Sequence, residues 1–197
     1  MKIYELCEPA TDSELELVVD LSNVCRNSSL DSSGEVARWD RIVRVLEVWN
    51  SKFPQFKKPK TRLVADNNLR FKLVGDDLLQ FKEALKLGIV IEAEKADPVL
   101  LDLAESSGCL ILSNDNYVGY QTERPWIHDP HQKRFIQISV LRSEIMLNEV
   151  THLERTGFSK SRAEESDRLK NHRIDLKRDA KSELLQSLFR CDNPKCI

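Results

Sequence analysis

The 197-residue sequence predicts a three-layer α/β/α sandwich with a central, mainly parallel sheet, followed by a long C-terminal helix. Two patterns support this prediction. Short apolar segments rich in Val, Ile and Leu alternate with amphipathic segments of roughly 10 to 18 residues, the order of βαβ crossover units. From residue 158 to residue 190 there is no Pro or Gly, and charges of both signs surround a narrow stripe of leucines, as in a long surface helix.

The first half of the chain contains two predicted strands and one helix. Residues 14–20, Glu-Leu-Glu-Leu-Val-Val-Asp, begin by alternating and end as an apolar pair, which suits a strand entering a buried sheet. After a loop rich in Asn and Ser, apolar residues recur at helical spacing over 35–52. A basic linker between Pro54 and Pro59 then leads to a second strand over 61–65.

The second half continues the alternation. A helix over 76–86 is followed by Gly88, a usual helix stop, and then by a strand over 89–91. Asp97 is a suitable N-cap for the next helix, which has Pro98 in its first turn. Further strands are expected over 109–112 and 135–141, and the predicted domains are 1–150 (sandwich), 151–190 (helical extension) and 191–197 (cysteine-containing tail).

Composition narrows the class of protein. Hydrophobic residues make up 41% of the chain, enough for a core, whereas the formal net charge of -2 gives no global signature of nucleic-acid binding. No apolar run is long enough to span a membrane, and the first residues lack the pattern of a signal peptide. The five cysteines are irregularly spaced, so we expect a cytoplasmic protein without disulfides.

Four acidic residues fall near the carboxyl ends of the predicted strands. Asp20 and Asp66 each end a strand, Asp115 follows the strand over 109–112, and Asp97 opens the helix before it. Because the carboxyl ends of parallel strands share one edge, these side chains should converge there. Their repulsion favours a bound cation, and oxygen ligands suit Mg²⁺ or Mn²⁺. Such an ion can activate water and stabilise charge on a transferring phosphoryl group, which predicts phosphodiester hydrolysis.

Each of these aspartates also has a structural interpretation when it is taken alone. An Asp at a strand end is often a turn former or a helix cap, and for Asp97 the capping role is specific. The joint placement of Asp20, Asp97 and Asp115 is what favours a catalytic metal site.

Three motifs resemble those of PIN-like nucleases. Val-Val-Asp-Leu-Ser-Asn-Val at 18–24 is similar to their opening motif, an apolar strand followed by Asp-Gly-x-Asn. Ala-Asp-Pro-Val-Leu-Leu-Asp-Leu-Ala at 96–104 resembles their helix with an acidic start. Leu-Ile-Leu-Ser-Asn-Asp-Asn-Tyr at 110–117 resembles the last motif of the NYN branch, which includes the Regnase-type (Zc3h12a-like) ribonucleases. The resemblance spans roughly residues 14–142 and implies an Mg²⁺- or Mn²⁺-dependent endoribonuclease acting on single-stranded RNA.

The resemblance also implies roles for individual residues. Asn23 matches the residue that orients the first carboxylate or a water on the metal, and Asn114 and Asn116 would shape the loop around the last acid. The implied catalytic and metal-coordinating residues are Asp20, Asp97 and Asp115.

The chain departs from the family at two positions. Leu21 stands where Gly is usual, and Ala96 stands where Regnase-type enzymes carry a second acid. Glu94 or Asp66 is the candidate source of the missing charge. These departures leave open a catalytically impaired RNA-binding domain of the same fold. A protein-interaction module that forms a homodimer through its C-terminal helix is a further alternative.

The segment 57–72 is strongly basic and is a candidate nucleic-acid contact, because Lys and Arg position phosphates without reading sequence. A solvated surface is an equally good interpretation. The residues are Lys57, Lys58, Lys60, Arg62, Arg70 and Lys72.

The tail contains a pair of cysteines with metal-ligand spacing. Cys191 and Cys196 form a Cys-x4-Cys pair, which is half of a zinc site that a longer chain would complete. A tail without metal is the alternative interpretation.

Overall fold

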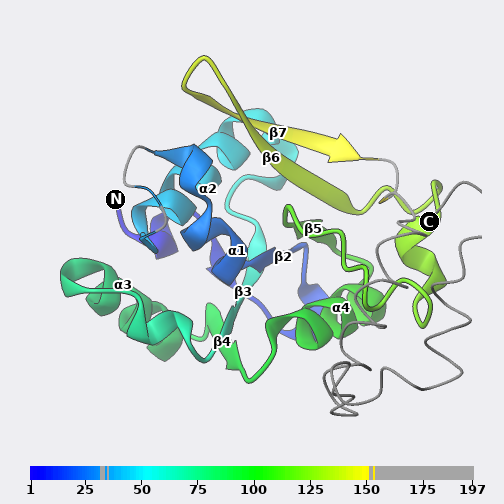
Figure 1. The fold of residues 1–197 in the computed structure, drawn as a ribbon, viewed down its shortest axis with the longest axis horizontal. Helices are drawn as coiled ribbons and strands as arrows, with labels where there is room; N and C mark the ends of the chain where they lie inside the picture. Colours follow the sequence, from blue (N-terminus) through cyan, green and yellow to red (C-terminus); the bar gives the residue numbers. More distant parts are fainter. Residues whose placement is uncertain (32–33, 35, 151–152, 154–197) are drawn as a thin grey trace, which may run out of the picture. The chain divides into compact units, whose positions relative to one another are not determined.

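A computed structural model describes residues 1–31, 34, 36–150 and 153, which form an α/β sandwich around a seven-stranded sheet (Figure 1). All of them belong to one compact unit, Met1–Arg155. The strands are β1 (Glu8–Pro9), β2 (Leu17–Asp20), β3 (Lys60–Asp66), β4 (Val90–Ala93), β5 (Leu110–Leu112), β6 (Phe135–Leu141) and β7 (Glu144–Val150).

The sheet is mainly parallel, as predicted. β2 lies between β3 and β5, and the order continues from β5 to β6 and β7. Both β1 and β4 pair with β3, and among the described strands only the β6–β7 pair is antiparallel. The α-helices in the described part are α1 (Leu21–Arg26), α2 (Asp40–Lys52), α3 (Gly75–Lys86) and α4 (Ala96–Ser107), and 3-10 helices are η1 (Ile3–Glu5), η2 (Asp12–Glu14), η3 (Ser28–Leu30), η4 (Pro54–Phe56), η5 (Leu69–Phe71) and η6 (Pro125–His128).

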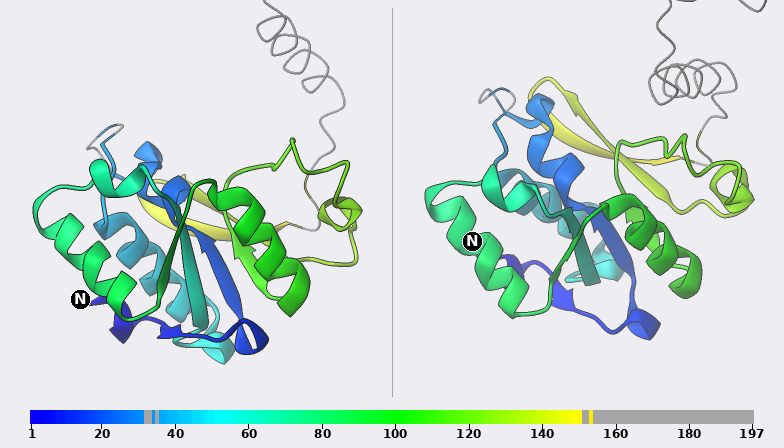
Figure 2. Two further views of the ribbon diagram at one scale, coloured as in Figure 1. Left: turned by 90° about the horizontal axis from the view of Figure 1, so that it is seen from below. Right: turned by 60° about the horizontal axis from the view of Figure 1, so that its bottom comes forward.

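Each central strand buries both of its faces, because successive side chains point to opposite sides of the sheet. Leu17 and Val19 of β2 and Leu112 of β5 pack into the cluster formed with α1, α2 and α3. Val18 and Ile111 pack into a second cluster with α4 and the segment after β5. In the view from below, β2 and β3 lie between α3 and α4 (Figure 2). The apolar run in each strand therefore reflects helices on both faces.

Two elements differ from the sequence-based expectation. α1 begins directly after β2, where a loop was predicted, and β7 follows β6 to form a hairpin. The two hairpin residues, Arg142 and Ser143, have φ values of 51° and 69°. Two positive φ values in a two-residue loop fit a type I′ turn, which usually contains Asn or Gly. The missing turn signal explains why β7 was not predicted.

The start of α4 also differs from the expectation. The prediction that Asp97 is the N-cap is wrong, because the N-cap position is Lys95 and Asp97 lies inside the first turn. The carboxylate that caps α4 belongs to the last residue of β3. Oδ1 of Asp66 accepts a hydrogen bond from the backbone N–H of Ala96 at 3.0 Å. Asp97 is therefore not used as a cap.

In the part of the chain that the structure describes, no helix is both long enough and apolar enough to cross a membrane. The helix predicted over 158–190, and the Cys191/Cys196 pair, lie outside the described residues. They stay predictions, as do the two boundaries between the three predicted domains.

Candidate active site

The chain reverses its direction of travel across the sheet between β2 and β5. From β2 it proceeds through β3 to β4 on one side, and it then returns through α4 to β5 on the other side. Ligands of open α/β sheets bind outside the carboxyl ends of strands at such a switch point. Val19 pairs with Leu112 and Asp20 with Val64, so Asp20 and the residues after Leu112 meet at this edge.

Asp20 is buried at the centre of the edge, with only 5% of its surface exposed. Its Oδ1 accepts a hydrogen bond from the backbone N–H of Asn23 at 2.9 Å and so caps α1. Its Oδ2 accepts a hydrogen bond from the hydroxyl of Ser113 at 3.0 Å. The helix-cap interpretation of Asp20 is confirmed, and the second oxygen connects Asp20 to the segment that carries Asp115.

The acids at this edge influence one another's ionisation. Burial raises the pKa of Asp20 to about 6, against the opposing effect of its two hydrogen bonds, and the carboxylates of Asp97 and Asp115 contribute to the rise. Burial also raises the pKa of Asp97, and the charges of Asp115 and Asp66 raise it further. The contributions of Asp97 and Asp115 to the pKa of Asp20, and of Asp115 and Asp66 to that of Asp97, mean that like charges lie close together at a partly buried position.

Ser113 links the acids of β2 and β5, although the sequence-based prediction did not include it. Its hydroxyl donates to Asp20 and accepts the backbone N–H of Asp115 at 3.0 Å. Oδ1 of Asp115 accepts the backbone N–H of Tyr117 at 2.8 Å, as in an Asx turn, and Oδ2 has no hydrogen bond to a described residue. One oxygen of Asp115 thus stays available to a ligand.

Tyr117 adds a buried hydroxyl beside the acids. Its side chain is 1% exposed, and among the described residues its hydroxyl has no hydrogen-bond partner. Burial raises the pKa of this phenol well above its usual range, and the Asp20 carboxylate raises it further. The Ser113 side chain lowers this pKa, so the phenol lies beside the hydroxyl that links Asp20 to the backbone of Asp115.

The predicted supporting asparagines have mainly structural contacts. Oδ1 of Asn23 accepts the backbone N–H of Asn114 at 3.2 Å. The side chain of Asn114 in turn bonds both backbone groups of Ile138 in β6, at 2.6 and 2.8 Å. The side chain of Asn116 is exposed and makes no hydrogen bond to a described residue. Asn23 and Asn114 therefore hold α1, the loop after β5 and β6 in one arrangement.

The two candidates for an extra charge differ. Asp66 lies at the same edge, but its Oδ1 caps α4 and its Oδ2 is 3.7 Å from the guanidinium of Arg26. Glu94 is exposed and makes no hydrogen bond or ion pair with a described residue. Arg26, which the sequence-based prediction did not include, places a cation beside Asp66 at this edge.

The structure separates the predicted basic residues between the two ends of the sheet. Lys60 is at the amino end of β3, paired with Glu14 at 3.0 Å, while Arg70 follows the carboxyl end and pairs with Glu92. The acids are at the carboxyl end, so only the second group lies on their side. The residues at or before the amino half of β3 are Lys57, Lys58, Lys60 and Arg62, and those beyond its carboxyl end are Arg70 and Lys72.

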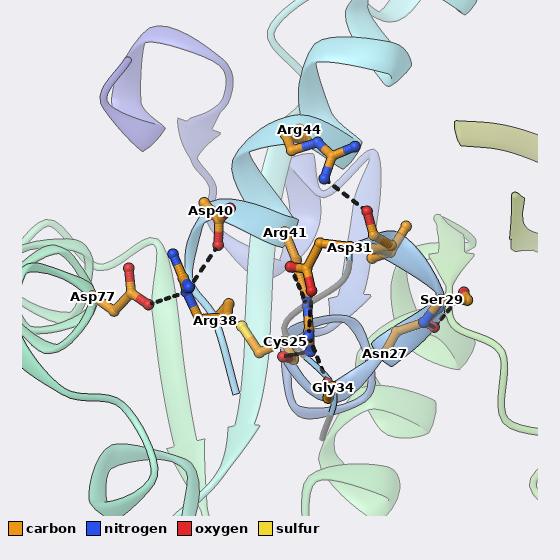
Figure 3. A network of polar contacts seen from close by, with 11 residues as sticks. Cys25, Asn27, Ser29, Asp31, Gly34, Arg38, Asp40, Arg41, Arg44 and Asp77 are labelled. Carbon is orange, nitrogen blue, oxygen red and sulfur yellow. Dashed lines mark hydrogen bonds and ion pairs between the residues drawn. The ribbon is translucent and has the colours of Figure 1, made fainter. Parts of the chain in front are cut away.

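Arg41 of α2 fixes the far end of α1 (Figure 3). It is fully buried and forms a two-pronged ion pair with Asp31, with both N–O distances at 2.8 Å. It also donates to the backbone oxygen of Cys25, at 2.7 Å, and of Gly34, at 2.8 Å. α1, which Asp20 caps at its start, is thus held at its end by a buried charge.

We expect Arg41→Ala to lower the free energy of unfolding by about 3–5 kcal/mol, because it removes the buried charge that joins the Asp31 carboxylate to the backbone oxygens of Cys25 and Gly34. Arg38→Ala is the matched control. Arg38 is 43% exposed in its ion pairs with Asp40 and Asp77, so its loss should cost less than about 1 kcal/mol. Urea unfolding followed by circular dichroism measures both values, and equal losses would contradict this account.

The donor set at the edge suits a hard divalent cation, although its geometry is open. In the described part of the chain, no three His, Cys, Asp or Glu side chains form a ready metal-binding group. Mg²⁺ usually keeps several waters and is held by one or two carboxylates, so a site with Asp20, Asp97 and Asp115 around it needs no closed cage. The oxygen of Asp115 that makes no hydrogen bond to a described residue is consistent with a hydrated ion.

The comparison with protein families agrees with this arrangement. Residues 16–159 match the family described as the Zc3h12a-like ribonuclease NYN domain. The chain belongs to this family. The NYN domain spans the edge just described, from β2 through β7, so the resemblance predicted from the three motifs is confirmed.

Solved structures share the fold of this NYN domain. Two structures of the nuclear protein-only RNase P 2 of Arabidopsis thaliana match it with TM-scores of 0.54 and 0.55, at 13% and 12% identity. The matches cover 74% and 71% of this chain and 32% and 31% of those chains. The likeness therefore extends over about a third of the plant protein and shows the fold alone. No curated protein sequence matches this chain.

Proposed function

We propose that this NYN domain is an endoribonuclease that hydrolyses single-stranded RNA with Mg²⁺ or Mn²⁺ held by Asp20, Asp97 and Asp115. The observation that carries the proposal is the position of Asp20 and Asp115 on either side of the sheet's switch point, where the charge of Asp115 contributes to the raised pKa of Asp20. RNA as substrate follows from the ribonuclease family to which the chain belongs.

The proposed chemistry assigns a task to each residue at the edge. A bound divalent ion supplies an activated water and stabilises charge on the phosphoryl group. The Ser113 hydroxyl holds the Asp20 carboxylate and the backbone of Asp115, and the backbone N–H of Tyr117 holds the Asp115 carboxylate, so both acids keep a fixed orientation toward the ion. Arg26 and Lys72 provide positive charge on the same side of the sheet.

The test is cleavage of end-labelled single-stranded RNA by the full chain in Mn²⁺, in Mg²⁺ and in EDTA. We expect internal cuts with either ion and none in EDTA. The products should carry 5′-phosphate and 3′-hydroxyl ends, because a water molecule and not the ribose 2′-hydroxyl attacks. Undiminished cleavage in EDTA, or 2′,3′-cyclic phosphate ends, would show that the acids are not the catalyst.

A second candidate function is RNA binding without catalysis. Ala96 favours it, because this side chain is buried against α4's apolar cluster where Regnase-type enzymes carry an acid. In that case the chain should bind the same RNA with equal affinity in Mn²⁺ and in EDTA, and leave it intact. The cleavage experiment therefore separates the two candidates.

A further inference from the structure

A polar cavity of about 530 Å³ lies beside the candidate active site. It is formed by the loop after β5, by the β6–β7 hairpin and by the first residue described beyond it. Its lining residues are Asn114, Asn116, Gln137, Ile138, Ser139, Asn148, Val150 and Leu153.

The cavity exists because one face of the hairpin is only partly covered. Phe135 is buried under Trp126, with the two rings nearly parallel and their centroids 5.9 Å apart. Gln137 is the next residue of β6 on that face and pairs with Asn148 of β7. Gln137 is half-buried and Ser139 is exposed, so the covering ends between Phe135 and Ser139. The amide side chains of Gln137 and Asn148 therefore lie next to the end of the apolar contact between Trp126 and Phe135.

Several hydrogen-bonding groups in the cavity have no partner in the described protein. The side-chain amides of Gln137 and Asn116 make no hydrogen bond to any described residue. Asn148 uses its amide nitrogen to donate to Ser139 at 2.8 Å, which leaves its oxygen as an acceptor. Asn114 is different, because both of its polar atoms are bonded to Ile138. The cavity therefore offers both donors and acceptors over an apolar floor of Val150 and Leu153.

The described lining contains no Lys, Arg, Asp or Glu. Lys and Arg supply most of the attraction between proteins and phosphate, and neither is in this described lining. The lining therefore suits a neutral, flat ligand rich in hydrogen-bonding groups, which can contact Val150 and Leu153. A nucleobase meets all three conditions. Asn and Gln amides pair with base edges, and proteins read RNA mainly through unstacked bases of single strands.

The cavity lies next to Asp115, one of the proposed metal-coordinating residues. Asn114 and Asn116 line it, and they are the immediate neighbours of Asp115. A base in the cavity therefore belongs to a nucleotide next to the phosphate held at the edge.

We propose that this cavity binds one unstacked RNA base beside the scissile phosphodiester, and that Gln137 and Asn148 read its hydrogen-bonding edge. The inference rests on the proposed function for the identity of the polymer. It adds a base preference at one position, read by the β6–β7 hairpin.

The test is the affinity of the full chain for fluorescent single-stranded hexanucleotides of A, C, G or U, measured by anisotropy in EDTA. The parent should prefer one base. Gln137→Ala and Asn148→Ala should each weaken binding of that RNA by about 10-fold and weaken the others less. Gln80→Ala is the control, because Gln80 lies on α3, which packs beside β4 at the other edge of the sheet.

The outcomes separate this inference from the proposed function. Base-dependent binding that both cavity variants lose, in a protein that cuts no RNA in Mn²⁺, would support the cavity and refute the nuclease. RNA cleavage with the parent's base preference intact in both variants would refute the cavity and leave the nuclease standing. Equal binding of all four hexanucleotides by the parent would also refute it.

Discussion

Asp20→Asn and Asp115→Asn are expected to lower RNA cleavage at least ~100-fold, because each removes a carboxylate from the ion that activates water and stabilises developing charge. The same variants should keep or raise the stability of the metal-free protein, since each removes one negative charge from a crowded edge. Loss of RNA cleavage without loss of stability would show that the residue coordinates the metal ion and does not merely support the fold. Cleavage rates and melting temperatures in EDTA measure the two effects.

The stability effect of Asp20→Asn should depend on pH in a defined direction. The pKa of Asp20 is about 6 in the folded protein, above the ~3.9 of an unfolded chain, so ionisation opposes folding. In the parent this destabilisation is absent below about pH 4, grows as pH rises through about 6, and then levels off near 3 kcal/mol. The stability advantage of the Asn variant should therefore appear between pH 4 and pH 7. An advantage that shrinks over that range would contradict the burial of an ionisable Asp20.

Added Mn²⁺ provides the control for this pair of variants. An ion that binds only the folded protein raises its melting temperature, so the parent should gain stability from Mn²⁺ and both variants should lose that gain. A variant that keeps the full Mn²⁺ stabilisation has lost no ligand.

Asp97→Asn should abolish cleavage, whereas Asp102→Asn should leave it nearly unchanged. The two residues lie on one helix and the substitution is chemically identical. They are five positions apart, about 140° around the helix axis, and so point in different directions. The charges of Asp115 and Asp66 raise the pKa of Asp97, so Asp97 lies near the other acids. The Asp102 side chain is 67% exposed and forms an ion pair with Arg124.

Single-turnover cleavage by the two α4 variants is the relevant measurement, because it excludes effects on product release. Comparable losses in both would mean that α4 contributes only fold stability or general charge. Activity retained in Asp97→Asn would remove this residue from the metal site.

Much of the edge could be predicted from the sequence because its acids follow the sheet's own periodicity. Apolar runs buried on both faces mark parallel strands, and the carboxyl ends of such strands lie together whatever the loops do. Asp20, Asp66 and Asp115 could therefore be placed at one edge from their positions after apolar segments. Asp97 was placed there too, although its predicted role as an N-cap was wrong.

The remaining features depend on contacts between segments that are distant in the sequence. Ser113 is one of several serines, and only the pairing of β2 with β5 brings its hydroxyl to Asp20. The capping of α4 by Asp66 crosses 30 positions of the chain, so no local pattern reveals it. Arg26 lies in the segment after Asp20 that was predicted to be a loop. Its position at the edge follows from α1, which the structure forms there instead. Distant pairing of this kind is invisible to local periodicity.

The central position of β2 has a consequence for how the protein can change over evolutionary time. A strand hydrogen-bonded on both sides is among the last to open in partial unfolding, whereas a terminal hairpin can open or be remodelled at small cost to the rest. Asp20 is carried by the first kind of element, and the Gln137–Asn148 pair by the second. Substitutions in β6 and β7 can therefore diversify what a descendant recognises while the geometry of its acids is inherited unchanged.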